Sequence, residues 1–265
     1  MIYHLATQDA SSDTLAGRSN AKCGVLLNIY SDIQDSASGV PRSEVFMSGM
    51  YVSSLSYTCP VDGNSTESVT LVGNNKVWYT SDGDMILTSE MFDNTDSPLD
   101  ANGVSRRENF VFNNADDGTT SLLPTEVEGI SPSGTNNKDA DGNYSAHVQS
   151  VTINTDLGRE ELMELGRRGP YFRPINFPVE VTCEIEVLSS QGDLVDMNED
   201  ADSNIEDQTI IIQLEDTTKL DLGTKNKLSN VTYGGGDAGG GNATTTYSYT
   251  TFNDLTVTHD NDPRT

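Results

Sequence analysis

The stretch Val179-Glu180-Val181-Thr182-Cys183-Glu184-Ile185-Glu186-Val187 alternates strictly between apolar and polar side chains. A period of two is typical of a β-strand, because successive side chains of a strand point to opposite faces of the sheet. One face of this strand would carry three valines, a cysteine and an isoleucine. The other face would carry Glu180, Thr182, Glu184 and Glu186. We therefore predict a strand over 179–187 with one buried face and one polar face.

Shorter runs of the same kind surround this strand. Residues 47–58 and 68–72 flank a turn-forming segment that contains Pro60, Asp62 and Gly63, which predicts a hairpin. Residues 149–155, 207–214 and 255–258 are further strand candidates. Many short strands with frequent turns favour a mainly β fold, either a β-sandwich or a β-barrel.

A short helix is predicted between 149–155 and 179–187. Asp156 is a candidate N-cap and Gly166 is a candidate C-terminal stop. The helix would have about two turns, which is too short to be stable alone. We therefore expect it to flank the sheet and to pack on it through Leu162 and Leu165.

The chain of 265 residues is expected to form a single domain over 1–265 with long loops. Residues 92–146 are dominated by Asp, Asn, Gly, Ser and Pro and are interpreted as a loop insertion. Residues 229–251 contain the glycine-rich run 234–241 and are interpreted as a Gly-rich loop or a second insertion.

The charge balance excludes several functions. There are 41 Asp and Glu against 15 Lys and Arg, which gives a formal net charge of −26. A protein that coats nucleic acid needs clustered cations, and a membrane-spanning helix needs about 20 consecutive apolar residues, which this sequence lacks. The acidic excess is consistent with solubility, with adaptation to high salt, or with a surface that must repel nucleic acid.

Nothing in the sequence indicates an enzyme or a cofactor. His4, His147 and His259 are the only histidines, and none lies in a spacing that is tied to a reaction. Neither the Gly-x-Ser-x-Gly pattern nor the His-Glu-x-x-His pattern occurs. The glycine run 234–241 lacks the Gly-Lys-Ser/Thr ending of a phosphate-binding loop. We therefore expect no catalytic residues and no cofactor.

Residues 196–207 form a weak candidate for a calcium site. Carboxylate and amide side chains occur at the spacing of a twelve-residue calcium loop, in Asp196, Asn198, Asp200, Asp202 and Asp207. The sixth position is Ala201 where a calcium loop needs glycine, the twelfth position is Asp rather than Glu, and strands rather than helices are expected on both sides. An acidic, solvated hairpin loop is the favoured interpretation, and no metal is predicted.

Positive and negative charge are separated along the chain. Between Arg173 and Lys219 there are twelve acidic residues and no basic one. Four arginines cluster around the predicted helix: Arg159, Arg167, Arg168 and Arg173. A basic patch and an acidic band on one chain favour self-association, in which the patch of one copy meets the band of another. The alternative is local pairing within one chain, for example of Arg159 with a nearby Glu.

Three segments resemble the tail tube proteins of long-tailed bacteriophages, in particular those with contractile tails. The first is Gly49-Met50-Tyr51-Val52-Ser53-Ser54-Leu55-Ser56-Tyr57, followed by 60–63 and 67–74. The second is the strand 148–155 with its short helix. The third is Gly166-Arg167-Arg168-Gly169-Pro170-Tyr171-Phe172-Arg173-Pro174-Ile175-Asn176-Phe177-Pro178-Val179-Glu180-Val181. Together they cover less than half of the chain.

The resemblance implies a β-barrel or sandwich with one flanking helix. It also implies hexameric rings that stack into a tube, with inner sheets that form a continuous lumen through which DNA passes without specific binding. Such a protein is a structural component of the virion tail that assembles in the host cytoplasm. Its partners would be further copies of itself and, if the tail contracts, the sheath or other tail proteins, with no membrane involved. Segments 92–146 and 229–251 would be insertions in the family fold.

The strand 179–187 is our candidate for the lumen wall. Its polar face, Glu180, Thr182, Glu184 and Glu186, would present carboxylates to the DNA and so avoid the attraction that accumulates when phosphates are neutralised. An ordinary solvated outer face is the alternative. Arg159, Arg167, Arg168 and Arg173 are the candidates for contacts between subunits or rings.

Two other classes of function remain open. A capsid decoration protein, or another accessory virion protein, shares thin β domains and polar loops but would form no tubes. A calcium-dependent binding module would use residues 196–207, and calcium would then raise its melting temperature.

Overall fold

The structure is a computed structural model that describes residues 15, 22–30, 41–80, 111–112, 147–188, 207–214, 219–235 and 242–258. These residues form twelve strands, with the following bounds: β1 Cys23–Ile29, β2 Ser43–Pro60, β3 Thr66–Val72, β4 Val77–Tyr79, β5 Val111–Phe112, β6 His147–Asp156, β7 Glu180–Leu188, β8 Ile211–Gln213, β9 Lys219–Asp221, β10 Lys227–Gly234, β11 Thr244–Phe252 and β12 Thr256–Thr258. The prediction of a mainly β fold is confirmed. Among the described residues there is no helix of the length and apolarity that a membrane span requires.

The alternating stretch forms β7, as predicted. Val181, Cys183, Ile185 and Val187 are all buried, whereas Glu180 and Glu184 are exposed and Thr182 and Glu186 are half-buried. Complete burial also raises the pKa of the Cys183 thiol, which keeps it neutral in the core. β7 therefore has one face in the core and one face toward solvent.

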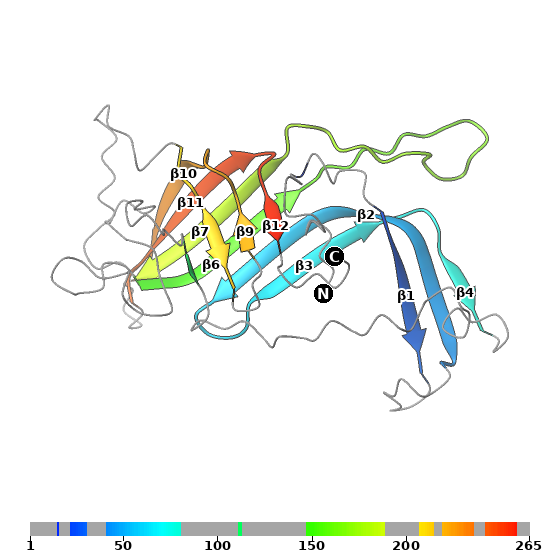
Figure 1. Cartoon of the computed structure of the whole chain (residues 1–265), viewed down its shortest axis with the longest axis horizontal. Helices are drawn as coiled ribbons and strands as arrows, with labels where there is room; N and C mark the ends of the chain where they lie inside the picture. Colours follow the sequence, from blue (N-terminus) through cyan, green and yellow to red (C-terminus); the bar gives the residue numbers. More distant parts are fainter. Residues whose placement is uncertain are drawn as a thin grey trace.

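An antiparallel sheet of eight strands organises the molecule (Figure 1). Its strand order is β1-β2-β6-β7-β11-β10, with β3 and β4 paired to β2 as well. β7 lies between β6 and β11, and its register with β11 is unbroken from Thr244↔Leu188 to Phe252↔Glu180. The hairpin predicted from 47–58 and 68–72 is confirmed by the pairing of β2 with β3.

The long strand β2 joins two parts of this sheet. Its first half pairs with β1 and β4, and its second half pairs with β3 and β6. The register with β3 shifts between Val52 and Ser54, which marks a β-bulge, and Gly49 has a positive φ of 64°. Bulges bend a strand and increase its twist. In Figure 1, β1, β4 and the first half of β2 accordingly project away from the rest of the sheet.

A second sheet of four strands, in the order β12-β9-β8-β5, covers the apolar face of the first. Ile212 of β8, Leu220 of β9 and Val257 of β12 are fully buried in the same cluster as the apolar side chains of β7 and the two tyrosines Tyr247 and Tyr249 of β11. The core therefore lies between two sheets, which is the arrangement of a β-sandwich.

The predicted helix at 159–165 is wrong. The segment forms an extended ribbon, in which Leu162 pairs with Phe172 in an antiparallel bridge. Asp156 accepts a hydrogen bond from the Gly158 amide at 2.9 Å and so closes a local turn instead of capping a helix. The helix had too few residues to be stable without packing, and its expected contact residue Leu165 is fully exposed.

The interpretation of 229–251 as a loop or insertion is also wrong for most of its length. Residues up to 234 belong to β10 and residues from 244 belong to β11, which lies inside the main sheet. The alternating Thr and Tyr residues of β11 were overlooked beside the glycine run. Of the expected insertion 92–146, the structure describes Val111 and Phe112, which form β5 and pair with β8.

The two faces of β7 predict opposite responses to truncation. Ile185→Ala should lower the free energy of unfolding by about 2–5 kcal/mol, because it leaves a cavity in a fully buried site. Glu184→Ala, one residue away on the exposed face, should change it by less than about 0.5 kcal/mol. Urea denaturation of the two variants provides the measurement, and equal losses would contradict the assigned faces.

Candidate functional site

The solvent face of the main sheet is a candidate functional surface. Glu180, Thr182, Glu184 and Glu186 of β7 lie on it, as the sequence predicted for the polar side of this strand. The carboxylates follow one another along a strand in the middle of the sheet, so they form a stripe across the centre of the face.

The neighbouring strands continue this face with small polar side chains. In the row through Glu184, Thr152 of β6 and Ser248 of β11 lie directly beside it. The same alternation places the following residues on the face: Ser54, Ser56 and Thr58 of β2; Thr66, Ser68 and Thr70 of β3; Ser150, Thr152, Asn154 and Asp156 of β6; Thr244, Thr246, Ser248 and Thr250 of β11. Phe252, at the end of β11, is a large apolar side chain that lies exposed on this face.

Hydrogen bonds between strands order part of this face. Ser56 donates to the Oδ1 atom of Asn154 at 2.7 Å, and Ser150 donates to the Oε2 atom of Glu186 at 3.2 Å. A shallow groove of about 430 Å³ crosses β2, β6 and β7 here, and its lining includes Asp156 and Glu180. The face is therefore hollowed, hydroxyl-rich and acidic.

The electrostatics of the face are one-sided. Asp156, Glu180, Glu184 and Glu186 are its described carboxylates, and Lys227 at the start of β10 is the one cation that the described strands of the sheet place on it. A phosphate backbone is held by several cations acting together, and the described part of this face does not offer such a set.

A ribbon over residues 157–179 connects β6 to β7. The Leu162 amide donates to the Phe172 carbonyl at 3.1 Å, the Tyr171 amide donates to the Leu162 carbonyl at 3.0 Å, and the Glu160 amide donates to the Pro174 carbonyl at 3.1 Å. At the tip, the Arg167 amide donates to the Glu164 carbonyl at 3.3 Å. Gly166 takes the third position of this turn with φ of 88°, a conformation that glycine adopts without strain.

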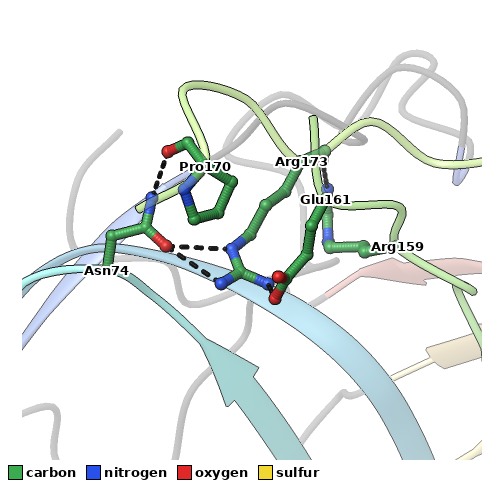
Figure 2. A network of polar contacts seen from close by, with 5 residues as sticks. All are labelled: Asn74, Arg159, Glu161, Pro170 and Arg173. Atoms are coloured by element: carbon green, nitrogen blue, oxygen red, sulfur yellow. Dashed lines mark hydrogen bonds and ion pairs between the residues drawn. The ribbon is translucent and has the colours of Figure 1, made fainter. Parts of the chain in front are cut away.

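The arginines Arg159 and Arg173 clamp the base of this ribbon (Figure 2). Arg173 donates to the Oδ1 atom of Asn74 at 2.9 Å and pairs with Glu161, and its side chain is only 11% exposed. The Nδ2 atom of Asn74 donates in turn to the Pro170 carbonyl at 2.6 Å. Both halves of the ribbon are thus held to the loop that follows β3, the first half through the pairing of Glu161 with Arg173.

Arg159 connects the ribbon to β2. It donates to the Val52 carbonyl and, at 2.8 Å, to the Arg173 carbonyl. Its guanidinium lies 4.7 Å from the ring centroid of Tyr51, and the Lys22 ammonium lies 5.3 Å from the same centroid. Burial lowers the pKa of Arg159, yet the partners described here keep the charged form in place.

The predicted arginine cluster therefore separates into two pairs. Arg159 and Arg173 make contacts within the chain, so the alternative of local pairing holds for them, although Arg159 pairs with carbonyl groups rather than with a Glu. Arg167 and Arg168 lie exposed at the ribbon tip, where Arg167 pairs with Glu164 at 3.5 Å. Only these two remain available for the predicted contacts between subunits.

Sequence reasoning missed Tyr51 and Asn74. Asn74 lies 99 positions from Arg173 in the chain, and no local pattern predicts a contact over that separation. Both residues fall within the first segment of the tail-tube resemblance, and Tyr51 also falls within the predicted strand 47–58, but neither signal gave them a role.

The calcium candidate falls largely outside the described residues. Asp196, Asn198, Asp200 and Asp202 lie there, and the structure describes only Asp207, which has a positive φ of 55° just before the bridge formed by Gln208. In the part of the chain that the structure describes, no three His, Cys, Asp or Glu residues are grouped so that they could hold a metal ion.

Comparisons with known proteins give little direct guidance. No family model and no curated protein matches the chain. Among solved structures, a chain from the virion of a native gene transfer agent particle aligns with a TM-score of 0.32 and 11% sequence identity, over 45% of this chain and 90% of that one. A likeness this weak carries no inference about the role of this chain.

The clamp predicts unequal effects for two arginines of the ribbon. Arg173→Met should lower the free energy of unfolding by about 1–3 kcal/mol, because it removes charge-assisted hydrogen bonds from a mostly buried side chain and leaves Asn74 with an unsatisfied carbonyl. Arg168→Met, the same change at an exposed site, should stay within about 0.5 kcal/mol of the parent. Urea denaturation measures both, and a loss at Arg168 as large as at Arg173 would contradict the clamp.

Proposed function

We propose that this chain is a structural subunit of a virion, and that six copies form a ring that stacks into a tail tube for DNA passage. The broad polar face of the main sheet supports this role more than any other observation. The opposite face of β6, β7, β11 and the second half of β2 packs into the core, so their polar face is the one that a ring can turn toward its centre. The number six and the stacking come from the tail-tube resemblance.

The chemistry of this face suits a conduit. DNA that moves through a tube must not be held, and a wall of carboxylates and hydroxyl groups offers a phosphate backbone repulsion and water instead of cations. Salt screens charges over about 8–10 Å at physiological ionic strength, so only side chains that face the lumen would act on the DNA directly. In this proposal Glu180, Glu184 and Glu186 face the lumen and line its wall.

The remaining partners follow from the same role. Further copies of the chain are the principal partner, and a sheath or other tail proteins would contact the outside of the tube if the tail contracts. DNA passes without specific binding, no cofactor is needed, and the chain acts as a structural component rather than as an enzyme. Its place is the tail of the virion after assembly in the host cytoplasm.

Electron microscopy of the purified protein across a concentration series tests this assembly. We expect rings, or open-ended tubes with a central hole, because a sheet with one polar face can line a lumen without exposing its core. Monomers or closed trimers at every concentration would contradict the ring and favour a capsid decoration protein. A rise in melting temperature on addition of calcium would instead favour the calcium-binding module.

Charge reversal on β7 tests the assigned lumen wall. Tubes of the triple variant Glu180→Lys, Glu184→Lys and Glu186→Lys should retain linear double-stranded DNA, with an affinity that falls steeply as salt rises, by a slope of about −0.9 for each phosphate contact. The matched variant with Gln at the same three positions should retain little DNA, because it removes repulsion without adding cations.

A comparison of linear with circular DNA shows whether the introduced lysines face the lumen or the outside of the tube. A covalently closed circle cannot thread a tube, so lysines in the lumen should bind linear fragments far better than circles. Equal binding of circles and linear fragments by the lysine variant would place β7 on the outside of the tube and contradict the proposal.

A further inference from the structure

Two apolar side chains near the tip of the 157–179 ribbon are exposed to solvent. Leu165 is 101% exposed and Met163 is 59% exposed. A single exposed leucine needs no explanation on an ordinary surface, but here it occupies the outermost turn of a projecting ribbon. Figure 1 shows this ribbon extending well beyond the ends of β6 and β7, on the side where β1 and β4 lie.

The local structure fixes this exposure. Leu165 and Gly166 are the two central residues of the turn that the Arg167 amide closes on the Glu164 carbonyl. The positive φ of Gly166 is compatible with this turn and interrupts a helix, so Leu165 cannot rotate onto the sheet as the second turn of a helix would require. Leu165 is therefore held outward by the backbone.

The clamp at the base makes the tip a prepared contact. Arg159 and Arg173 hold the two strands of the ribbon to β2 and to Asn74, and the Leu162–Phe172 bridge joins the strands to each other. A loop of more than twenty residues would lose much conformational freedom on binding, but this one has already lost it on folding. Binding of the tip to a partner therefore costs little further conformational entropy of the ribbon.

The charges of the ribbon indicate what that partner is. The segment 157–179 has four Arg and three Glu, whereas the whole chain has 41 acidic and 15 basic residues. Two Glu of the ribbon pair with Arg173 and Arg167, and Arg168 lies exposed just after the turn that carries Leu165. A tip with a cation beside an apolar anchor is complementary to an acidic surface, and the rest of this chain is strongly acidic.

We propose that the ribbon tip is a self-docking element, in which Leu165 inserts into an apolar site on a second copy of this chain and Arg168 pairs with carboxylates around that site. This inference rests on the proposed function only in requiring self-association. It identifies the tip, rather than the whole arginine cluster, as the contact. The acidic bodies of two copies repel each other, and the tip is the projection that overcomes this repulsion.

Sedimentation analysis of the full chain and its variants tests the inference. Leu165→Asp and Leu165→Ser should each weaken self-association at least about tenfold, because they remove an anchor at the centre of the contact. The matched variant Leu165→Met should associate like the parent. Arg168→Glu should weaken association to a similar degree, and added salt should weaken the parent for the same reason.

A direct measurement names the partner. A photoreactive amino acid placed at position 165 should cross-link to a second copy, and a mixture of isotopically light and heavy protein should give light–heavy products with an attached peptide next to acidic residues. The same amino acid at position 233, an exposed tyrosine at the other end of the sheet, is the control. At concentrations where the parent is monomeric, the melting temperatures of the position 165 variants should equal that of the parent, because the side chain there is fully exposed and has no contact to lose.

The outcomes separate this inference from the proposed function. The proposal of a self-docking tip is overturned if Leu165→Asp associates as well as an associating parent, or if cross-links form only within one chain. Neither of these results contradicts the proposed tube. If the parent associates through the tip into closed particles without a central hole, the self-docking proposal is supported and the proposed tube is overturned. A parent that stays monomeric at every concentration overturns both.

Discussion

One-sided burial of the main sheet is the constraint on which the rest of this structure depends. Successive side chains of β7 alternate between a core of Val181, Cys183 and Ile185 and a polar face of glutamates. A shift of the pairing by one residue would place the glutamates in the core and expose the aliphatic side chains. The register with β6 and β11 is therefore strongly determined, and it carries the hydroxyl rows of those strands to the same side.

Two surfaces of opposite character result from this arrangement. The sheet face is acidic and hydroxyl-rich along β7 and its neighbours, whereas the ribbon tip offers an exposed leucine and a nearby cation. The two surfaces are consistent with the proposed conduit, which would need an inert inner wall and also specific contacts between its copies. Their separation in space lets each surface be optimised without affecting the other.

The predicted helix shows where local signals fail. Asp156, Gly166 and the glutamates between them match the start and end of a helix, but the same residue types also favour turns. Asp156 closes a turn onto Gly158, and Gly166 serves the turn at the ribbon tip. A helix of two turns needs tertiary packing to be stable, and in this molecule the partners of the segment, Asn74 and Val52, stabilise an extended ribbon instead.

The sequence by itself determined the mainly β fold, the position of β7 and the identity of its two faces, because a strand's side-chain period is local and can be read without knowing its neighbours. It also determined the acidic character of the polar face. Only the tertiary structure decided which arginines clamp the ribbon and which lie exposed at its tip, and that Leu165 projects outward. Those outcomes depend on contacts between residues up to about a hundred positions apart, such as Arg173 with Asn74, whose energies no local pattern contains.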